Sequence, residues 1–290
     1  MLATLLFCCL VINEIAYAPP NQGSEYVELF NAGASVIDLA DATLYDSTRR
    51  PRPVVDRSLT LKAGAYVVLV QDPTAFEASF PGVPFLPVSG WPTLNNTGDE
   101  VGISVGGVEV DLVAYQPDWS NSPAPLERID PQGPSSHPVN WTSSPTGGTP
   151  GAINAAYRPD RDPPRMIYAE RFLTDSLLVV FSEPVVPVGA AAFGARSVRW
   201  SNDSTAWAAG SPPGPARVQG VEDLFGNRTS ETGMATVGLP ETGEVIITER
   251  LLRPVSDPFD GVPDQTRFVE LWNAGKRAVS VRGLRLQGAV

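Results

Sequence analysis

The opening of this chain is repeated near its end, and the repeat constrains the fold more than any other feature. The first copy reads Val11-Ile12-Asn13-Glu14-Ile15 and then Tyr26-Val27-Glu28-Leu29-Phe30-Asn31-Ala32-Gly33. The second copy reads Ile246-Ile247-Thr248-Glu249 and then Phe268-Val269-Glu270-Leu271-Trp272-Asn273-Ala274-Gly275. Solenoid repeats recur every ~20–50 residues, so copies this far apart indicate a repeated domain.

The two copies also suggest how the chain is divided. When they are aligned, Val290 corresponds to Thr48, whereas the first copy continues to Asn154. We therefore expect a piece of a longer multi-module protein whose second copy is truncated. The expected parts are a leader over 1–9, a domain over 10–157, a second domain over 163–240 and the start of the second copy over 244–290.

Turn-forming residues are abundant and point to an all-β fold. The chain holds 29 Pro and 26 Gly and shows no long helical periodicity. Its hydrophobic residues, 42% of the total, are enough to build a packed core. Short strands joined by tight turns are typical of β-sandwiches. One short helix is expected over 73–80.

Two segments give particular expectations about strands. In Tyr26–Phe30 the alternation places Val27 and Leu29 on one face and Tyr26, Glu28 and Phe30 on the other. A second segment should form a hairpin closed by Gly106-Gly107, since a two-residue glycine loop suits a primed turn. Its strands should bury one face, while Ser104, Glu109 and Asp111 face water. The buried pairs expected there are Val105 with Val108, Ile103 with Val110, and Val101 with Leu112.

The charge and the cysteines exclude several classes of function. The net charge of −11 disfavours nucleic-acid partners, because an acidic surface repels phosphate groups. Both cysteines, Cys8 and Cys9, lie in the apolar leader, so the folded body should have no disulfide. The leader resembles the core of a secretory signal, although it lacks a basic start and an A-x-A site. It is either a truncated signal or a buried first strand. No transmembrane segment is expected.

Several motifs, taken in order, resemble a lamin-tail domain of the bacterial secreted type. The resemblance covers about residues 10–155 and implies an immunoglobulin-like β-sandwich in a secreted or surface protein. The second copy matches only the opening motifs. The residues that carry the resemblance are Val11-Ile12-Asn13-Glu14-Ile15, Tyr26-Val27-Glu28-Leu29, Asn31, Gly33, Leu94-Asn95-Asn96-Thr97-Gly98-Asp99-Glu100-Val101, Leu126-Glu127-Arg128, Trp141, Thr149-Pro150-Gly151 and Asn154.

The middle of the chain is similar to bacterial immunoglobulin-like domains. The similarity rests on Val180-Phe181-Ser182-Glu183-Pro184-Val185 and on Val221, Asp223, Gly226 and Asn227. Together the two resemblances imply tandem immunoglobulin-like β-sandwiches, the last one incomplete. Modules of these types accompany other domains, often enzymes. The chromatin binding of animal lamin tails is not expected here, because the acidic chain offers no basic face.

Residues able to carry catalysis are few. His137 is the only histidine and lies in a loop-like segment, so a catalytic triad or a histidine-rich metal site is excluded unless another chain contributes. Glu14 and Glu28 recur as Glu249 and Glu270. This recurrence favours a role in the fold, such as accepting N–H groups of turns or pairing with Arg. A catalytic carboxylate pair, as in glycosidases, is the alternative.

Two charged loops remain as candidate binding elements. Asp257, Asp260 and Asp264 lie in an acidic insertion that either ligates Ca²⁺, a cation that prefers oxygen, or forms plain turns. Arg49-Arg50-Pro51-Arg52 is the sole basic cluster, and it is either a solvated loop or a docking point for an acidic partner.

We expect a non-catalytic extracellular or cell-surface module that acts in spacing, adhesion or protein interaction, without cofactor or metal. The partner would be a protein or a cell-surface polymer. One alternative is the accessory region of a secreted enzyme whose catalytic domain lies beyond the C-terminus. Another is carbohydrate binding through Trp91, Trp119 or Trp141, which an exposed pair of indoles would favour and burial of all three would remove.

Overall fold

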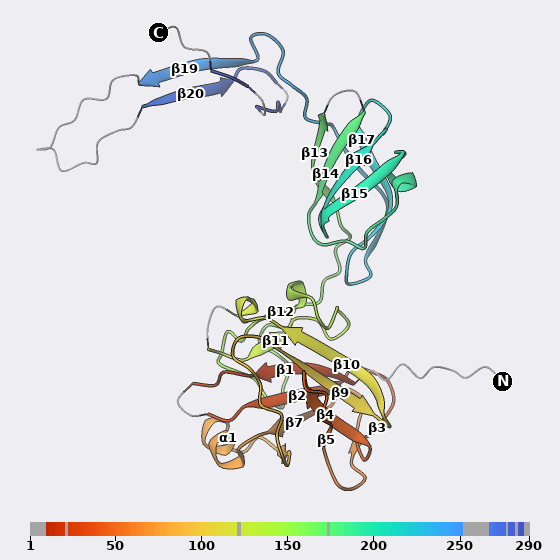
Figure 1. Cartoon of the computed structure of the whole chain (residues 1–290), viewed down its shortest axis with the longest axis vertical. Helices are drawn as coiled ribbons and strands as arrows, with labels where there is room; N and C mark the ends of the chain where they lie inside the picture. Colours follow the sequence, from red (N-terminus) through yellow and green to blue (C-terminus); the bar gives the residue numbers. More distant parts are fainter. Residues whose placement is uncertain are drawn as a thin grey trace, which may run out of the picture. The chain divides into compact units, whose positions relative to one another are not determined.

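The structure is a computed structural model that describes residues 10–20, 23–120, 123–172, 175–251, 267–276, 278–281 and 284–286. The chain divides into two compact units, Met1–Arg161 and Asp162–Val290. Both units are built from strands joined by turns (Figure 1), which confirms the all-β prediction. The expected domains over 163–240 and 244–290 both lie within the second unit.

The first unit is a sandwich of two sheets. A two-strand ladder of β3 (Ile37–Asp38) and β6 (Thr60–Leu61) accompanies them. The larger sheet has the order β12-β11-β1-β2-β7-β8, formed by Trp141–Ser143, Leu126–Arg128, Leu10–Ala16, Tyr26–Asn31, Tyr66–Val70 and Phe85–Pro87. The smaller sheet has the order β10-β9-β4-β5, formed by Val108–Tyr115, Asp99–Val105, Ala42–Asp46 and Arg52–Pro53.

The core of the first unit lies between these sheets. Val27 and Leu29 are fully buried in it, as the alternation of β2 predicts. Tyr26 belongs to a separate cluster on the outer face of the larger sheet. The helix α1 (Pro73–Ser79) contributes Phe76 to that cluster, and Asp72 caps the helix by accepting N–H groups of its first turn. The larger sheet is therefore covered on both faces.

The hairpin β9–β10 has its predicted turn but not its predicted register. Val105 pairs with Val108 across the Gly106-Gly107 loop, as the sequence indicates. At Val110 one extra residue enters β10, and every later pair is shifted by one position. A bulge of this kind bends the strand and reverses the direction of the side chains that follow. Val108, expected in the core, is 65% exposed at the tip.

The bulge exchanges the two faces of β10 beyond the tip. Val113 takes the position opposite Val101 that the alternation assigns to Leu112. Of the six side chains expected in one cluster, only Val101 and Ile103 are fully buried. Asp111, expected in water, is buried instead. The prediction was wrong here because strict alternation assumes an uninterrupted strand.

The second unit contains a smaller strand-rich body with its own core, built around Phe181, Val185 and Phe193. Asp223 accepts the N–H groups of Phe225 and Asn227 and so closes a turn over residues 223–227. Its four-stranded sheet has the order β13-β14-β16-β15, formed by Met166–Phe172, Ser176–Phe181, Thr205–Ala209 and Ser197–Asn202. A further pair joins β17 (Ala216–Glu222) to β18 (Arg228–Met234).

The second unit also contains the hairpin of β19 (Val245–Leu251) and β20 (Phe268–Asn273). Large apolar side chains such as Ile247 and Trp272 are 57% and 59% exposed on it. After β20 the chain pairs with the smaller body, where the Ser280 N–H donates to the Gly238 carbonyl at 2.9 Å. The hydroxyl of Ser280 donates to Glu170.

The hairpins β1–β2 and β19–β20 have the same register. In the first, Ile12 pairs with Leu29 and Glu14 with Glu28, with one extra residue, Asn13, in between. In the second, the corresponding pairs are Ile247–Leu271 and Glu249–Glu270, and the extra residue is Thr248. The side chain of each extra residue donates to the glutamate on the neighbouring strand, Glu28 or Glu270.

Candidate functional site

Three buried glutamates form a row across the outer face of the larger sheet of the first unit. Glu14 on β1 pairs with Glu127 on β11 and with Glu28 on β2. All three side chains are fully buried. The bulge at Asn13 turns Glu14 to this face while leaving Ile12 in the core. We call these three residues the glutamate row.

The glutamate row is covered by the segment 144–157, here called the covering loop. Glu14 accepts the Thr149 N–H through both oxygens at 3.2 Å, and Glu28 accepts the Gly151 N–H at 2.5 Å. Glu127 accepts the Ala156 N–H at 2.7 Å. Each carboxylate of the row therefore holds one backbone N–H of the loop. The prediction that Glu14 and Glu28 accept N–H groups of turns is confirmed.

Side chains complete the hydrogen bonding of the row. Tyr26 donates its hydroxyl to Glu14. The hydroxyls of Ser144 and Thr149 donate to one oxygen of Glu127, at 2.6 and 2.8 Å. Donors that converge in this way repel a cation, so the row is built to hold the covering loop rather than a metal ion.

An amide pair extends the same network. Asn13 donates to Glu28 and to the side-chain carbonyl of Asn154, both at 2.8 Å. Asn154 donates in turn to the backbone carbonyls of Asn13 and Arg128, at 3.0 and 2.8 Å. The end of the covering loop is thereby fastened to two strands. The motif Thr149-Pro150-Gly151 followed by Asn154 supplies this fastening.

The loop can approach the row this closely because residue 148 is glycine. Gly148 has φ +117°, a conformation that other L-residues rarely adopt. A Cβ atom there would lie 2.6 Å from the Tyr26 hydroxyl and 3.1 Å from a Glu14 oxygen. A side chain at this position would push the loop away from the carboxylates.

Burial dominates the electrostatics of the row. The pKa of Glu14 is raised to about 8, mainly by loss of solvation. The neighbouring carboxylates Glu28 and Glu127 contribute to this rise, and the hydrogen bond from Tyr26 opposes it. Burial likewise raises the pKa of Glu28 to about 7, although the Gly151 N–H opposes this effect. Raised carboxyl pKa values are found in catalytic acids and also in buried structural networks.

A second polar network joins the two sheets of the sandwich. The bulge in β10 directs Asp111 inward, where one oxygen accepts the Ile12 N–H at 2.8 Å and an Arg128 N–H at 2.9 Å. Arg128 also donates to the Ile12 carbonyl and lies over the ring of Trp141. Breaking such a buried pair typically costs about 3–5 kcal/mol. Strict alternation along β10 places Asp111 on the solvent face, so the sequence pattern did not predict this ion pair.

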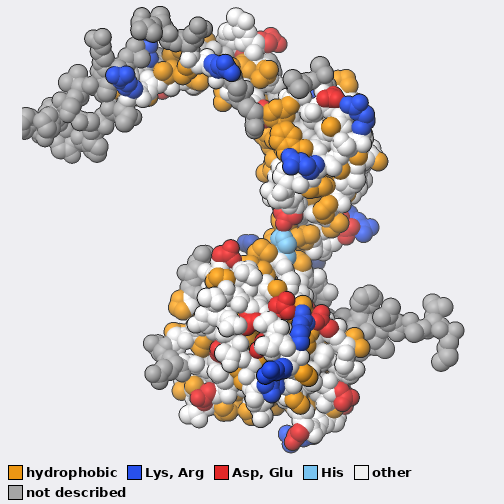
Figure 2. Space-filling model, in the orientation of Figure 1, with side chains coloured by type: hydrophobic (Ala, Val, Ile, Leu, Met, Phe, Trp, Pro, Cys, Tyr) orange, Lys and Arg blue, Asp and Glu red, His pale blue; other side chains and the backbone are white. Residues whose placement is uncertain are grey.

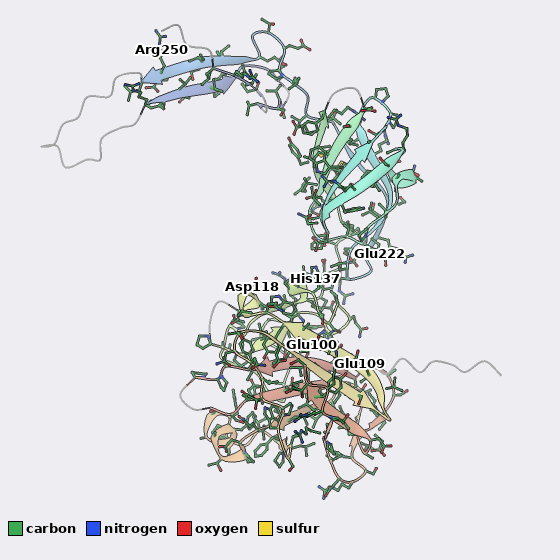
Figure 3. The ribbon with its side chains drawn as sticks, viewed as in Figure 1. Glu100, Glu109, Asp118, His137, Glu222 and Arg250 are labelled. Atoms are coloured by element: carbon green, nitrogen blue, oxygen red, sulfur yellow. The ribbon has the colours of Figure 1, made fainter. Side chains whose placement is uncertain are left out.

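His137 has a local structural contact. Its Nδ1 accepts the Val139 N–H at 3.2 Å and caps a short 3-10 turn at Pro138–Asn140. Figure 3 shows His137 on a loop of the first unit, away from the labelled Glu100 and Glu109. The ring is half-buried.

The basic cluster is partly neutralised. Arg49 forms ion pairs with Glu100 at 2.7 Å and Glu109 at 2.8 Å, on the exposed side of β9 and β10. On the face of the first unit shown in Figure 2, acidic and basic side chains are interspersed. Exposed pairs of this kind contribute little to stability, and they leave less free positive charge for an acidic partner.

The three indoles considered for carbohydrate binding pack against the core. Trp141 is buried, and Trp91 and Trp119 are half-buried against the same cluster. Trp91 also donates its indole N–H to Glu25 at 2.7 Å. These three indoles form no exposed platform, so they do not support carbohydrate binding. Asp257, Asp260 and Asp264, the calcium candidates, lie outside the described residues.

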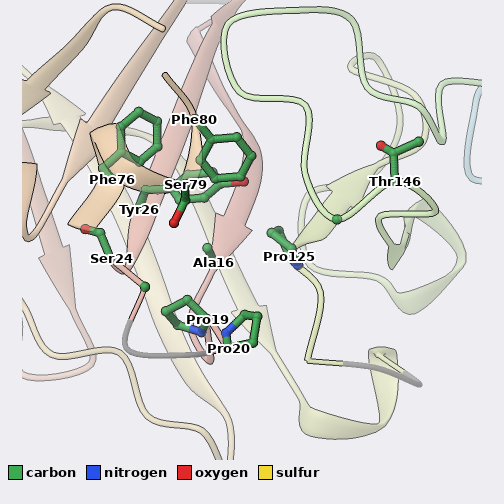
Figure 4. A pocket seen from close by; sticks show the side chains of 12 residues that line it. Ala16, Pro19, Pro20, Ser24, Tyr26, Phe76, Ser79, Phe80, Pro125 and Thr146 are labelled. Atoms are coloured by element: carbon green, nitrogen blue, oxygen red, sulfur yellow. The ribbon is translucent and has the colours of Figure 1, made fainter. Parts of the chain in front are cut away.

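A cavity of about 320 Å³ opens beside the glutamate row (Figure 4). Tyr26, Phe76 and Phe80 form its aromatic wall, and Pro125 and Thr146 lie across from them. None of the three glutamates lines it. Because Tyr26 lines the cavity and also donates to Glu14, this ring separates the cavity from the carboxylates.

Among known families, one family model matches part of the first unit. The family model of the lamin tail domain, an immunoglobulin-like module, matches residues 9–117. No curated protein and no solved structure gives a significant match. The match ends before β11, β12 and the covering loop, which the structure places on the same sandwich. Within the described residues, no helix has the length and apolar character needed to cross a bilayer.

Proposed function

We propose that the chain is a non-catalytic interaction module of a secreted or cell-surface protein. The lamin-tail match over residues 9–117 supports a module of immunoglobulin-like type. The observation that carries the proposal is the burial of the glutamate row. Glu14, Glu28 and Glu127 are the strongest acid–base candidates in the first unit, yet the covering loop shields all three.

A catalytic carboxyl group must reach the atom to which it gives a proton or from which it takes one. In the glutamate row the acceptor positions are occupied by N–H and O–H groups of the protein itself. The raised pKa values of Glu14 and Glu28 then reflect the cost of burying charge and are no sign of catalysis.

Hydrolysis assays test the proposal directly. The purified chain should release no 4-nitrophenol from the phosphate monoester, the acetate or the β-glucoside above the buffer rate. Glu14→Gln and Glu28→Gln variants should give the same result. Turnover by the parent chain that either variant abolishes would refute the non-catalytic function.

We further infer that β19–β20 opens a second module of the lamin-tail type. This inference is supported by the register that β19–β20 shares with β1–β2. Each hairpin has one extra residue, Asn13 or Thr248, whose side chain donates a hydrogen bond to a glutamate on the neighbouring strand. A second detail also recurs. The Gly33 N–H donates to Asn31 and the Gly275 N–H to Asn273, both at 3.0 Å. The smaller body between them, with its turn at Asp223, would be the immunoglobulin-like spacer.

An extracellular location and a bacterial source are proposed from the resemblance of the motifs to secreted lamin-tail domains. The apolar leader is consistent with export but lies outside the described residues. The net charge of −11 supports a protein or neutral polymer as partner over a nucleic acid. Protease treatment of intact cells that carry an epitope-tagged chain would remove the tag if the chain is surface-exposed and spare it if the chain stays inside.

A further inference from the structure

A second cavity opens on the outer face of the larger sheet, beyond Glu28 and away from the cavity of Figure 4. Its volume is about 400 Å³, within the range of small-ligand sites. Every lining residue belongs to the first unit. We call it the aromatic groove, and it is lined by Phe30, Tyr66, Tyr157 and Ile153 together with polar groups that include Asp130 and Gln132.

Three rings shape the aromatic groove. Phe30 and Tyr66 pair across β2 and β7 and stack with ring centroids 4.6 Å apart. Tyr157 stands at the end of the covering loop and is 48% exposed. Its backbone N–H donates to the Asn154 carbonyl at 3.0 Å, so the fastening of that loop also holds the ring in place. The groove therefore offers aromatic surface on a pre-formed frame.

The hydroxyls of Tyr66 and Tyr157 remain available to a ligand. Neither makes a hydrogen bond to another group in the described part of the chain. Phenol groups usually find a partner when their rings are packed. Asp130 and Gln132 add a carboxylate and an amide to its lining. The groove thus combines ring faces with several donors and acceptors.

The charge of the groove selects among ligands. Among the described residues no Lys or Arg lines it, and Asp130 lies on its wall. Burial raises the pKa of Tyr66, and the nearby carboxylate of Glu28 raises it further. Phosphate, sulfate and uronate groups would be repelled from such a site.

We propose that the aromatic groove binds a neutral pyranose ring, as a free saccharide or as the end of a surface glycan. One face of a pyranose presents polarised C–H groups that the negative face of an aromatic ring attracts. Its edge presents hydroxyls that pair with phenol, amide and carboxylate groups. This assignment rests on the proposed interaction role and replaces Trp91, Trp119 and Trp141 with a different set of rings.

Isothermal titration of the full chain tests the assignment with named probes: cellotetraose, xylotetraose and chitotetraose, with trigalacturonate as the anionic probe and decaproline as the peptide probe. At least one neutral tetraose should bind with a Kd of about 1 mM or tighter. Tyr157→Ala should raise that Kd about tenfold, because one ring contact is lost. Tyr157→Phe, which keeps the ring, should raise it less.

Trp272→Ala serves as the matched control, because it removes an exposed aromatic ring outside the groove. Its Kd should equal that of the parent, and each variant should melt at the parent temperature. Absence of binding by all three neutral probes, preference for trigalacturonate or decaproline, or unchanged affinity in Tyr157→Ala would each overturn the saccharide assignment. These outcomes concern binding alone. The non-catalytic function fails only if hydrolytic turnover is measured, so the two failures can be told apart.

Discussion

Raising the pH toward neutrality should destabilise the first unit, because unfolding releases protons from the glutamate row. The pKa values of Glu14 and Glu28 are about 8 and about 7 in the fold, against 4.5 for an ordinary glutamate. Between these limits the folded chain retains protons that the unfolded chain has lost. Stability from this source is complete below pH 4.5 and is lost as the pH rises through the raised values.

The size of the effect follows from the proton count. One proton changes the free energy of unfolding by about 1.4 kcal/mol per pH unit, so two give an upper limit of about 2.7 kcal/mol per pH unit. Glu14 and Glu28 interact, and their protons are therefore not released independently. We expect a combined loss of about 3 kcal/mol between about pH 5 and pH 7, and the loss continues to about pH 8 because of the raised pKa of Glu14.

Urea denaturation at a series of pH values measures this loss, with hydrogen exchange of peptides from 10–16 and 144–157 reporting on the first unit. The midpoint for these peptides should fall steadily from about pH 5 to about pH 7. A Glu14→Gln/Glu28→Gln double variant should lose most of this slope, whatever its absolute stability. A midpoint that stays level or rises, or a double variant with the parent slope, would show that these carboxyls do not carry protons in the fold.

Three further experiments probe the hairpins. Ile103→Asp should lower the free energy of unfolding by more than about 4 kcal/mol, because it buries an unpaired carboxylate. Val108→Asp at the exposed tip should change this free energy by less than about 0.5 kcal/mol. Equal urea midpoints for the two variants would refute the bulged register. Gly102→Ala should cost about 1–3 kcal/mol, because a Cβ there would lie 2.2 Å from the ring of Tyr45, and adding Tyr45→Ala should recover part of the loss in thermal melts. Limited digestion should cleave within 244–290 before it cleaves the first unit, since the apolar side chains of β19–β20 are exposed. Survival of 244–290 for as long as the first unit would contradict this order of cleavage.

The sequence predicted those parts of the fold that depend on local pattern. The alternation in Tyr26–Phe30 gave the correct faces of β2, because that strand is regular. The segment 73–80 became α1, since Asp72 and Pro73 mark a helix start. The recurrence of Glu14 and Glu28 as Glu249 and Glu270 favoured acceptance of N–H groups from turns, and both side chains accept such groups. For β2 and α1, neighbouring residues carried enough information.

Features that depend on an extra residue in a strand could not be read in this way. The bulge at Val110 changes which face Asp111 occupies, and no composition rule marks it. Glu127 was quoted only as part of a motif, although it completes the row with Glu14. The one available signal was the sequence Thr149-Pro150-Gly151 with Asn154, whose free N–H and amide groups require acceptors elsewhere in the fold.

Comparison of the two hairpins distinguishes the contacts of the glutamates within a hairpin from their contacts with distant segments. At the bulge, Asn13 and Thr248 differ in type, yet each supplies a donor to the glutamate on the next strand. That contact is local and holds the register of the hairpin itself. The second function of Glu28, acceptance of the Gly151 N–H, requires a segment more than 100 residues away. A glutamate that recurs together with its bulge therefore indicates a hairpin of defined register. It indicates a binding site for a covering loop only where such a loop is present.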